Sequence, residues 1–376
     1  MNITSFIHPF RTFLPCSGVG RHMNGVLLSL AACPDTRLDL LCSRQWIGSD
    51  RLLPPNCPLR ELPLHTFPFP ENVTERLWKL TGFPSMDRFL PPDTDWVFCP
   101  METRLPMKRR PVAITIHDIK AFEPDLPESN TPAHRQFRKR WSRWIHKAIR
   151  DSAVVFTVSE FSKRRMVELL DAPEGKIVVS GNGVDPRFAA LGDRRSGAPA
   201  PHAAPYALII GGLRLQKGAS AVLEIARLMQ SVNPEFHFDV VGPNEAQWLP
   251  RAQSLPNVRL HGFLDDKAVD DLLCRATALL FLSEYEGFGI PPLEALAVGV
   301  PAIVADRASL PEVVGDAGYI VNPTTHHEIV SLLAALADGR ERYDVAKGQA
   351  RAGRYTWDSV AGKVLATLNE RGRDSR

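Results

Sequence analysis

The 376-residue sequence contains only six cysteines and no long apolar run. The cysteines form no C-x-x-C pair and have no histidines at ligand spacing, which argues against a zinc site and against a disulfide framework. No run approaches the roughly 20 apolar residues that a membrane-spanning helix needs, and the first residues show no basic leader followed by an apolar core. We therefore expect a cytoplasmic protein whose cysteines are small buried apolar residues.

Two recognition patterns are also missing. The stretch SGVGRHM, residues 17–23, lacks the third glycine of a dinucleotide fingerprint because Met23 stands in its place. This departure disfavours an NAD-dependent dehydrogenase. No nucleic-acid recognition motif accompanies the basic residues, so we expect no nucleic-acid partner.

The composition is that of an ordinary soluble globular protein, with 44% apolar and 23% charged residues. At 376 residues the chain is too long for one ordinary core. It predicts two domains of roughly 150–200 residues each.

Short β-rich runs alternate with helical patterns in both halves of the chain. The expected strands are NITSFI, LDLLC, DWVFC, VAITI, AVVFTV and KIVVS, then YALIIG, FHFDVVG, NVRLHG, TALLFLS, VPAIVAD and GYIVN. Near-continuous apolar strands of this kind are typical of parallel sheets buried on both faces. Residues 191–205, rich in Pro, Ala, Gly and Arg, predict a linker between a domain over 1–190 and a second over 206–355.

The positive charge is concentrated in the first half. Residues 1–190 contain 26 Lys+Arg and 20 Asp+Glu, against 19 and 22 in the remainder. Residues 134–150 contain seven Lys/Arg and no acid, and a helix there would gather its apolar side chains on one stripe. The stripe fits a helix docked on its own domain. It also fits adsorption to an anionic lipid surface, and both readings stay open.

The stretch LFLSEYEGFGIPPLEALAVGVPAIVAD, residues 280–306, combines an apolar strand, a glycine-containing loop and a helix that begins with two prolines. The start of such a helix favours an anion, most naturally a phosphate. Glu286 and Glu294 would repel phosphate, but they are placed to accept hydrogen bonds from hydroxyls on either side of it. Hydroxyls that flank a diphosphate indicate a nucleotide sugar.

This stretch resembles the E-x7-E signature of the family 4 retaining glycosyltransferases, with Glu286 and Glu294 as the two glutamates. The similarity extends from SGVGRH near the N-terminus to YTWDSVAGKVLATL near the C-terminus. It implies an α/β fold of the GT-B architecture, in which two Rossmann-like, doubly wound parallel-sheet domains face each other across a cleft. The N-terminal domain then binds mainly the acceptor and the C-terminal domain mainly the nucleotide sugar. We expect residues 356–376 to form a helix that packs back toward the N-terminal domain.

The resemblance also assigns the donor-binding residues that follow the strand. Glu286 is expected against the donor hexose and Glu294 against the ribose. The backbone of Phe288, Gly289 and Ile290 is expected to hold the hexose and the diphosphate.

A second donor segment is IIGGLRLQKGAS, residues 209–220, which is similar to the family's G-R-L-x-x-x-K-G segment. Lys217 and Arg214 are expected to neutralise charge on the departing diphosphate. The match is incomplete, because Gly212 occupies the usual arginine position and Arg214 is the nearby arginine. We include Gly212 among the donor-binding positions.

In the N-terminal half, His117 and Asp118 directly follow an apolar strand, at the sheet edge where ligands bind. The family carries a similar pair whose histidine approaches the donor sugar, so His117 is a candidate catalytic residue and Asp118 a candidate acceptor contact. A purely structural histidine is the alternative. The segment SGVGRH resembles the loop in which Gly18, Gly20 and Arg21 approach the acceptor or phosphates.

The sequence Asp93-x-Asp95 has the pattern of a metal-dependent transferase, but we exclude that role. These carboxylates precede a strand of the basic domain, far in sequence from the donor loop. A helix start and Lys217 supply the charge stabilisation that a divalent ion would otherwise give. We expect no metal and no cofactor other than the nucleotide sugar.

The resemblance implies retaining transfer of a hexose to a hydroxyl of a glycan. Bacterial relatives with this motif style often use GDP-mannose to build lipopolysaccharide or exopolysaccharide, which favours mannose as the sugar and a lipid-linked glycan as the acceptor. UDP-glucose or another nucleotide sugar stays open. So does contact of residues 134–150 with the inner face of the cytoplasmic membrane. A nucleotide-sugar epimerase and a non-catalytic sugar-nucleotide-binding protein are the rival functions.

Overall fold

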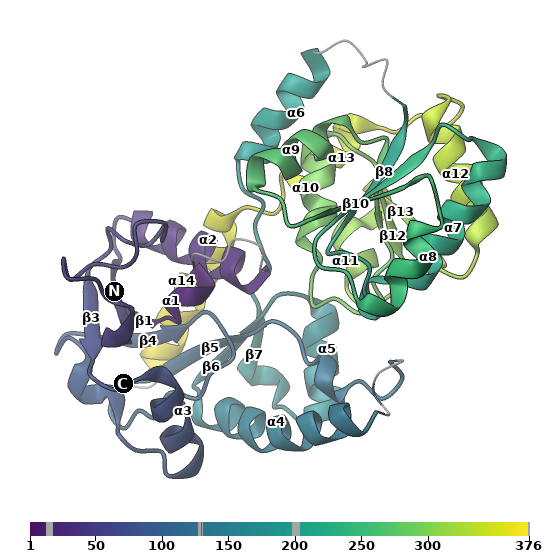
Figure 1. Cartoon of the computed structure of the whole chain (residues 1–376). Coiled ribbons are helices and arrows are strands. Elements are labelled where there is room, and N and C mark those ends of the chain that lie inside the picture. The colour runs from purple at the N-terminus through teal and green to yellow at the C-terminus, as the bar shows by residue number, and fades with distance from the viewer. Residues whose placement is uncertain (13–17, 127–128, 130, 198–203, 375–376) are drawn as a thin grey trace. The chain divides into compact units, whose positions relative to one another are not determined.

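The computed structural model describes residues 1–12, 18–126, 129, 131–197 and 204–374, and Figure 1 shows their arrangement into elements. The chain forms two compact units. The first unit comprises Met1–Gly183 and Thr356–Arg376, and the second comprises Val184–Tyr355. Within the described residues, each unit is built on one parallel sheet, of seven strands in the first and six in the second, which confirms the predicted α/β fold.

The sheet of the first unit has the strand order β3-β2-β1-β4-β5-β6-β7. Its strands are β1 (Asn2–Phe6), β2 (Arg37–Ser43), β3 (Leu64–Phe67), β4 (Trp96–Cys99), β5 (Val112–Ile116), β6 (Val154–Thr157) and β7 (Ile177–Val179). Its helices are α1 (Pro9–Thr12), α2 (Gly18–Ala32), α3 (Glu71–Leu80), α4 (Pro132–Asp151), α5 (Glu160–Leu170) and α14 (Trp357–Asp374). Every residue of β4, β5 and β6 is buried, as the continuous apolar runs predict.

Helix α4 is the basic, aromatic helix that the sequence predicts. It begins after Thr131, whose hydroxyl accepts a hydrogen bond from the amide of His134 at 3.2 Å. Ile145, Ala148 and Ile149 are buried in the core of the first unit. Phe137, at the other end of the stripe, is 53% exposed. The helix is therefore docked on its own domain mainly through its C-terminal half.

Helix α14, although last in the chain, belongs to the first unit. Its side chains Val360, Ala361, Val364 and Leu368 are all buried in the core around β1 to β6. The indole of Trp357 occupies a notch between Gly25 and Gly183. A Cβ at Gly25 would lie 2.2 Å from the indole, and one at Gly183 would lie 2.6 Å from it, so both positions require glycine.

The sheet of the second unit has the order β10-β9-β8-β11-β12-β13. Its strands are β8 (Tyr206–Ile210), β9 (His237–Val241), β10 (Val258–Gly262), β11 (Ala278–Phe281), β12 (Ala302–Ala305) and β13 (Tyr319–Val321). Its helices are α6 (Arg187–Gly197), α7 (Ala219–Val232), α8 (Leu249–Gln253), α9 (Asp266–Arg275), α10 (Ile290–Val298), α11 (Leu310–Val314), α12 (His326–Ala337) and α13 (Val345–Ala352).

The segment predicted as a linker, residues 191–205, is helical in its first part. Residues 187–197 form α6, which packs on α10 so closely that a Cβ at Gly192 would lie 2.7 Å from the carbonyl oxygen of Ala297. Arg187 lies 3.4 Å from a carboxylate oxygen of Asp266 on α9. These contacts make α6 part of the second unit, so the chain leaves the first unit at Gly183, before the predicted linker. Residues 198–203 lie outside the described residues.

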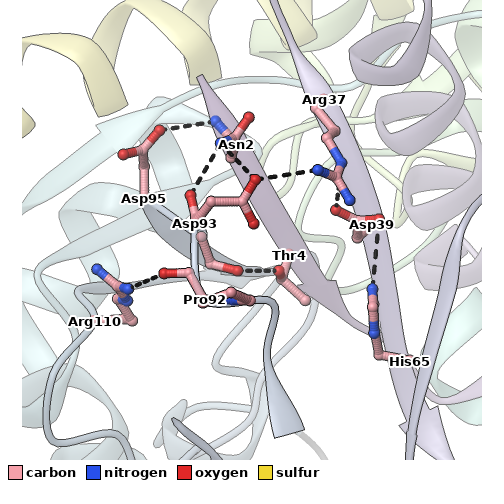
Figure 2. A network of polar contacts seen from close by, with 10 residues as sticks. Asn2, Thr4, Arg37, Asp39, His65, Pro92, Asp93, Asp95 and Arg110 are labelled. Carbon is pink, nitrogen blue, oxygen red and sulfur yellow. Dashed lines mark hydrogen bonds and ion pairs between the residues drawn. The ribbon is translucent and has the colours of Figure 1, made fainter.

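A polar network at the amino ends of β1, β2 and β4 contains the Asp-x-Asp pair (Figure 2). Asp95 accepts a hydrogen bond from the amide of Asn2 at 2.9 Å. Asp93 accepts one from the guanidinium of Arg37 at 3.1 Å, and Arg37 also pairs with Asp39. The two aspartates therefore tie strand ends together, at the edge of the sheet opposite the carboxyl ends of the strands.

No helix in the described part of the chain combines the length and the apolar character that a membrane crossing requires.

Candidate functional site

Both sheets reverse their strand order once, and this reversal determines where a ligand crevice forms. The reversal lies between β1 and β4 in the first unit and between β8 and β11 in the second. In doubly wound sheets, ligands bind outside the carboxyl ends of the strands at such a switch point. In the second unit, the two loops at this place are residues 211–218 after β8 and residues 282–289 after β11.

The loop after β8 begins with two glycines in left-handed conformations, Gly211 (φ 110°) and Gly212 (φ 75°). A Cβ at Gly212 would lie 1.9 Å from the carbonyl oxygen of Pro243, so packing against the neighbouring loop already requires glycine there. The amide of Leu213 donates to the side-chain oxygen of Asn244 at 2.7 Å. The course of this loop is thus fixed by the loop after β9.

The two switch-point loops are joined by hydrogen bonds. The amide of Glu284 donates to the carbonyl of Gln216 at 2.9 Å, and the Gln216 side chain donates to the carbonyl of Tyr285 at 3.1 Å. Gly218 (φ 72°) lets the first loop pass the second, because a Cβ there would lie 2.3 Å from the carbonyl oxygen of Leu282. Side chains from both loops are consequently held side by side.

Lys217 and Glu286 form the charged pair of this site. The ammonium nitrogen of Lys217 lies 2.5 Å from Oε1 of Glu286, and both side chains are 17% exposed. The same ammonium lies 5.0 Å from the centre of the Phe281 ring. The structure therefore brings together two residues that the sequence places 69 positions apart.

Arg214 lies three residues before Lys217 and is partly buried. Its guanidinium forms no hydrogen bond or ion pair with another described residue, and its carbonyl accepts the amide of Lys217 at 2.9 Å. An arginine with five unused donors near the glycine-rich loop is suited to a diphosphate.

Ser309, which belongs to none of the sequence motifs, holds the loop that carries Glu286. Its buried hydroxyl lies 2.9 Å from the carbonyl oxygen of Glu286 and 2.8 Å from that of Phe288. Ser309 follows β12, so it reaches the same sheet edge as the loop after β11. Its place shortly after an expected strand, VPAIVAD, was the available signal.

The start of α10 offers fewer amides than an ordinary helix start. Gly289 (φ 99°) precedes the helix, and the prolines at positions 291 and 292 carry no N–H group. The amides that remain at this start are those of Phe288, Gly289 and Ile290, which are the residues assigned to hexose and diphosphate. Glu294 follows on α10 and is 4% exposed.

The predicted residues of the N-terminal half lie in the first unit. His117 is buried, and its Nε2 lies 3.1 Å from the carbonyl oxygen of Pro100, to which it donates. Its ring meets the ring of His22 edge to face at 4.6 Å, and Nδ1 of His22 lies 2.7 Å from Oδ1 of Asn182. Burial lowers the pKa of His117 to about 4 and that of His22 to about 3. Both rings are neutral at ordinary pH.

The remaining predicted acceptor contacts lie near this histidine pair. Gly18, Gly20 and Arg21 form the first turn of α2, the helix that carries His22. Asp118 accepts a hydrogen bond from the amide of Lys120 at 3.0 Å, which closes the turn after β5. Their roles toward an acceptor stay predictions.

Two family models of glycosyltransferases match the chain, one mainly in the first unit and one in the second. Residues 33–188 match the family model Glycosyltransferase Family 4, and residues 194–353 match the model Glycosyl transferases group 1. The O-antigen chain mannosyltransferase B of Escherichia coli is 27% identical over 293 residues, which cover 72% of this chain and 73% of that protein.

Two further relatives extend the comparison. A GDP-mannose-dependent alpha-(1-6)-phosphatidylinositol dimannoside mannosyltransferase of Mycobacterium tuberculosis is 33% identical over 129 residues, 34% of this chain and 33% of that protein. The crystal structure of Anabaena HepE in complex with UDP and glucose superposes with a TM-score of 0.67 at 16% identity, over 98% of this chain and 100% of that one. At this identity the likeness shows the fold.

Proposed function

Because the chain belongs to the GT-B glycosyltransferases, with a family 4 domain followed by a group 1 domain, we propose that it transfers a hexose from a nucleoside diphosphate sugar to a glycan hydroxyl with retention of anomeric configuration. The favoured donor is GDP-mannose. The E. coli relative is a mannosyltransferase and the M. tuberculosis relative is named as GDP-mannose-dependent. A UDP-sugar is the second candidate, since the Anabaena structure contains UDP and glucose.

The observation that carries the proposal is the pairing of Lys217 with Glu286 at the switch point of the second sheet. A cation at that edge suits the diphosphate of a nucleotide sugar, and a carboxylate there suits the hydroxyls of its hexose. Lys217 and Arg214 face the diphosphate, and the amides of Phe288, Gly289 and Ile290 complete its cradle. Glu286 accepts hydrogen bonds from the hexose and stabilises positive charge that develops on its ring.

The reaction proceeds on one face of the sugar. The acceptor oxygen forms a bond to the anomeric carbon as the bond from that carbon to the diphosphate oxygen breaks. The breaking bond's electron pair passes to the diphosphate, which also takes the proton of the acceptor hydroxyl. Catalysis then consists of positioning the substrates and of stabilising the leaving diphosphate. Lys217 and Arg214 stabilise the leaving diphosphate. His117 and Asp118 remain the candidates for contact with the sugar and the acceptor.

The acceptor we propose is a lipid-linked or lipopolysaccharide glycan, by analogy with the O-antigen chain named for the E. coli relative. We expect the enzyme to work in the cytoplasm. Contact of α4 with an anionic membrane stays a prediction.

A thermal-shift panel tests the donor. We expect GDP-mannose to raise the melting temperature more than GDP, UDP-glucose or UDP-galactose do, because at equal concentration the ligand with the lowest Kd stabilises the folded state most. A ligand present at about 100 times its Kd stabilises it by about 2.7 kcal/mol. A larger shift with a UDP-sugar would move the assignment to that donor, and no shift with any nucleotide sugar would refute the proposal.

Product analysis separates transfer from the rival functions. Transfer yields an α-linked product from an α-linked donor and persists in EDTA. Isomerisation of the donor without acceptor would identify an epimerase. Binding without transfer or hydrolysis would identify a non-catalytic protein.

A further inference from the structure

The first unit contains a cavity of about 400 Å³ that none of the predicted site residues lines. We infer that it is a carbohydrate subsite, which binds an uncharged sugar residue of the acceptor glycan. That the bound sugar belongs to the acceptor follows only if the proposed function is right. That the cavity binds a sugar is argued from the residues that line it.

The position of the cavity is that of a ligand site. His8, Phe10 and Arg11 follow β1, and Glu102 follows β4, so the cavity lies at the carboxyl edge of the first sheet where its strand order reverses. The loops that carry Lys217 and Glu286 occupy the same place in the second sheet. Its volume also falls in the range of about 300–1,000 Å³ typical of small-molecule sites.

One wall of the cavity is a continuous aromatic stack on α4. The rings of Phe137 and Trp141 lie 6.0 Å apart with an interplanar angle of 21°, and those of Trp141 and Trp144 lie 6.3 Å apart at 17°. Trp141 also stacks on Phe122 at 5.5 Å, which anchors the stack to the core. Flat, rigid, partly exposed rings of this kind suit the apolar C–H face of a pyranose.

The polar lining combines hydrogen-bond donors with acceptors. Arg11 and Arg140 supply donors, and Glu75 and Glu102 supply carboxylate oxygens. Nε of Arg11 is buried and has no hydrogen-bond partner among the described residues. Sugar hydroxyls both donate and accept, so they can satisfy the two kinds of group at once.

The same lining disfavours an anionic ligand. Glu75 lies beside His8, at 3.2 Å, and Glu102 accepts a hydrogen bond from the amide of His117 at 2.8 Å. Burial alone would lower the pKa of His8, but its hydrogen bonds to Glu71 and Glu75 raise it, so His8 is a third cation beside the two arginines. The carboxylates of Glu71, Glu75 and Glu102 face these three cations, and the lining therefore offers little net positive charge to a phosphate or an anionic lipid headgroup. An uncharged hexose does not need such a charge.

Sugar binding by the full-length protein tests the inference. The probes are the methyl α-glycosides of mannose, glucose and galactose, with α-linked mannobiose, followed by saturation-transfer NMR and titration calorimetry. We expect at least one to bind, and Trp141→Ala and Arg11→Gln each to weaken it by about tenfold, the loss of one good contact of about 1.4 kcal/mol. Arg143→Ala, an exposed cation on the same helix that does not line the cavity, is the matched control and should bind as the wild type does.

Two outcomes would overturn the inference. One is that no sugar binds the wild-type protein, or that the Trp141 and Arg11 variants bind it as tightly as Arg143→Ala. The other is that Trp141→Ala loses binding to phosphatidylglycerol vesicles while its sugar affinity is unchanged, which would assign the aromatic stack to a membrane surface. Circular dichroism of each variant verifies its fold.

Measuring the KM for the nucleotide sugar separates a test of the cavity from a test of the proposed function. If the inference is right, Trp141→Ala raises the KM for the acceptor by about tenfold and leaves the KM for the nucleotide sugar within about twofold. A protein that binds sugar in the cavity but shows no melting shift with any nucleotide sugar would refute the proposed function and leave the cavity assignment intact.

Discussion

At the scale of single residues, the buried pair His22 and His117 makes stability depend on pH. Burial lowers the pKa of both rings below the ordinary value of 6.5, to about 3 and about 4. The unfolded chain therefore binds more protons than the folded chain as the pH falls below 6.5, and the free energy of unfolding falls with it. The loss continues until the pH reaches the folded pKa of each ring.

We expect each histidine to account for about 1–2 kcal/mol of stability lost between pH 7 and pH 5. The variant His22→Gln should be less stable than the wild type at pH 7 but should lose less stability on acidification. Urea unfolding at the two pH values measures the difference. Burial raises the pKa of Glu102, which works in the opposite direction, but both proteins retain that group. Equal losses in the two proteins would contradict the prediction.

Glu286 is the residue on which the proposed chemistry depends most. Glu286→Gln keeps the shape of the side chain but removes the charge beside Lys217, so we expect kcat to fall by at least about 100-fold, the scale of losing one transition-state contact. The measurement is release of nucleoside diphosphate in the presence of acceptor. Glu284→Gln, in the same loop, is the control and should remain active. Near-normal turnover by Glu286→Gln would refute the assignment.

The sequence alone predicts which residues gather at the donor site, but not how they are held. The E-x7-E spacing and the lysine segment point to one sheet edge, where the structure pairs Glu286 with Lys217. The position of Ser309 after an expected strand places it at the right sheet edge, but its hydrogen bonding is not predictable from the sequence, because the carbonyls that its hydroxyl contacts lie more than 20 positions away. The requirement for Gly212 likewise comes from the Pro243 backbone, which no local pattern reveals.

At the scale of elements, the start of α10 depends on Gly289. Its φ of 99° is unfavourable for any other residue, and a Cβ would lie 2.7 Å from the side chain of Leu310. We expect Gly289→Ala to destabilise the protein by about 1–3 kcal/mol and to weaken donor binding, because the amides at this start would shift.

A glycine within a helix provides the control for that variant. A Cβ at Gly362 on α14 would meet no atom within 4 Å, so Gly362→Ala should stabilise the protein by about 0.5–1 kcal/mol. Thermal melts with and without nucleotide sugar measure both variants. Destabilisation by Gly362→Ala, or tolerance of Gly289→Ala, would show that the backbone argument is wrong.

The elements that sequence patterns missed are those stabilised by tertiary contacts. Strand β3 has only four residues, too few to show a reliable alternation of apolar and polar side chains. It is held by its parallel pairing with β2. Residues 191–197 of helix α6 fall in the predicted linker, because the stretch 191–205 is rich in Pro, Ala, Gly and Arg and has no apolar periodicity. The stability of α6 comes from the close approach of Gly192 to α10 and from the Arg187 ion pairs with α9. The long apolar strands are predictable because a strand buried on both faces is a continuous apolar run, whichever strand lies beside it.

At the scale of the whole molecule, the first unit depends on α14, a helix that follows the second unit in the sequence. Three buried side chains of α14, Val360, Val364 and Leu368, each contribute about 1.5–3 kcal/mol by burial, and their sum is comparable to the entire stability of a domain, about 5–15 kcal/mol. Deletion of residues 356–376 should therefore unfold the first unit and leave the second folded.

Hydrogen exchange read by mass spectrometry distinguishes the two units. Amides in β1, β4 and β5 should lose protection in the deletion variant, while those in β8, β11 and β12 should keep it. Protection that is retained in β1 would mean that α14 is dispensable. Strand order, and with it both switch points, was beyond prediction from the sequence because it depends on which distant strands pair.

The return of the chain from the second unit to the first also bears on biosynthesis. A ribosome completes the whole 184–355 unit before it makes the tryptophan that fills the notch between Gly25 and Gly183. Residues 1–183 must therefore remain with an incomplete core until the side chains of α14 have been synthesised. Chaperones that shield nascent chains would meet this protein chiefly through residues 1–183, and termination of synthesis before residue 356 would yield products without a stable first unit.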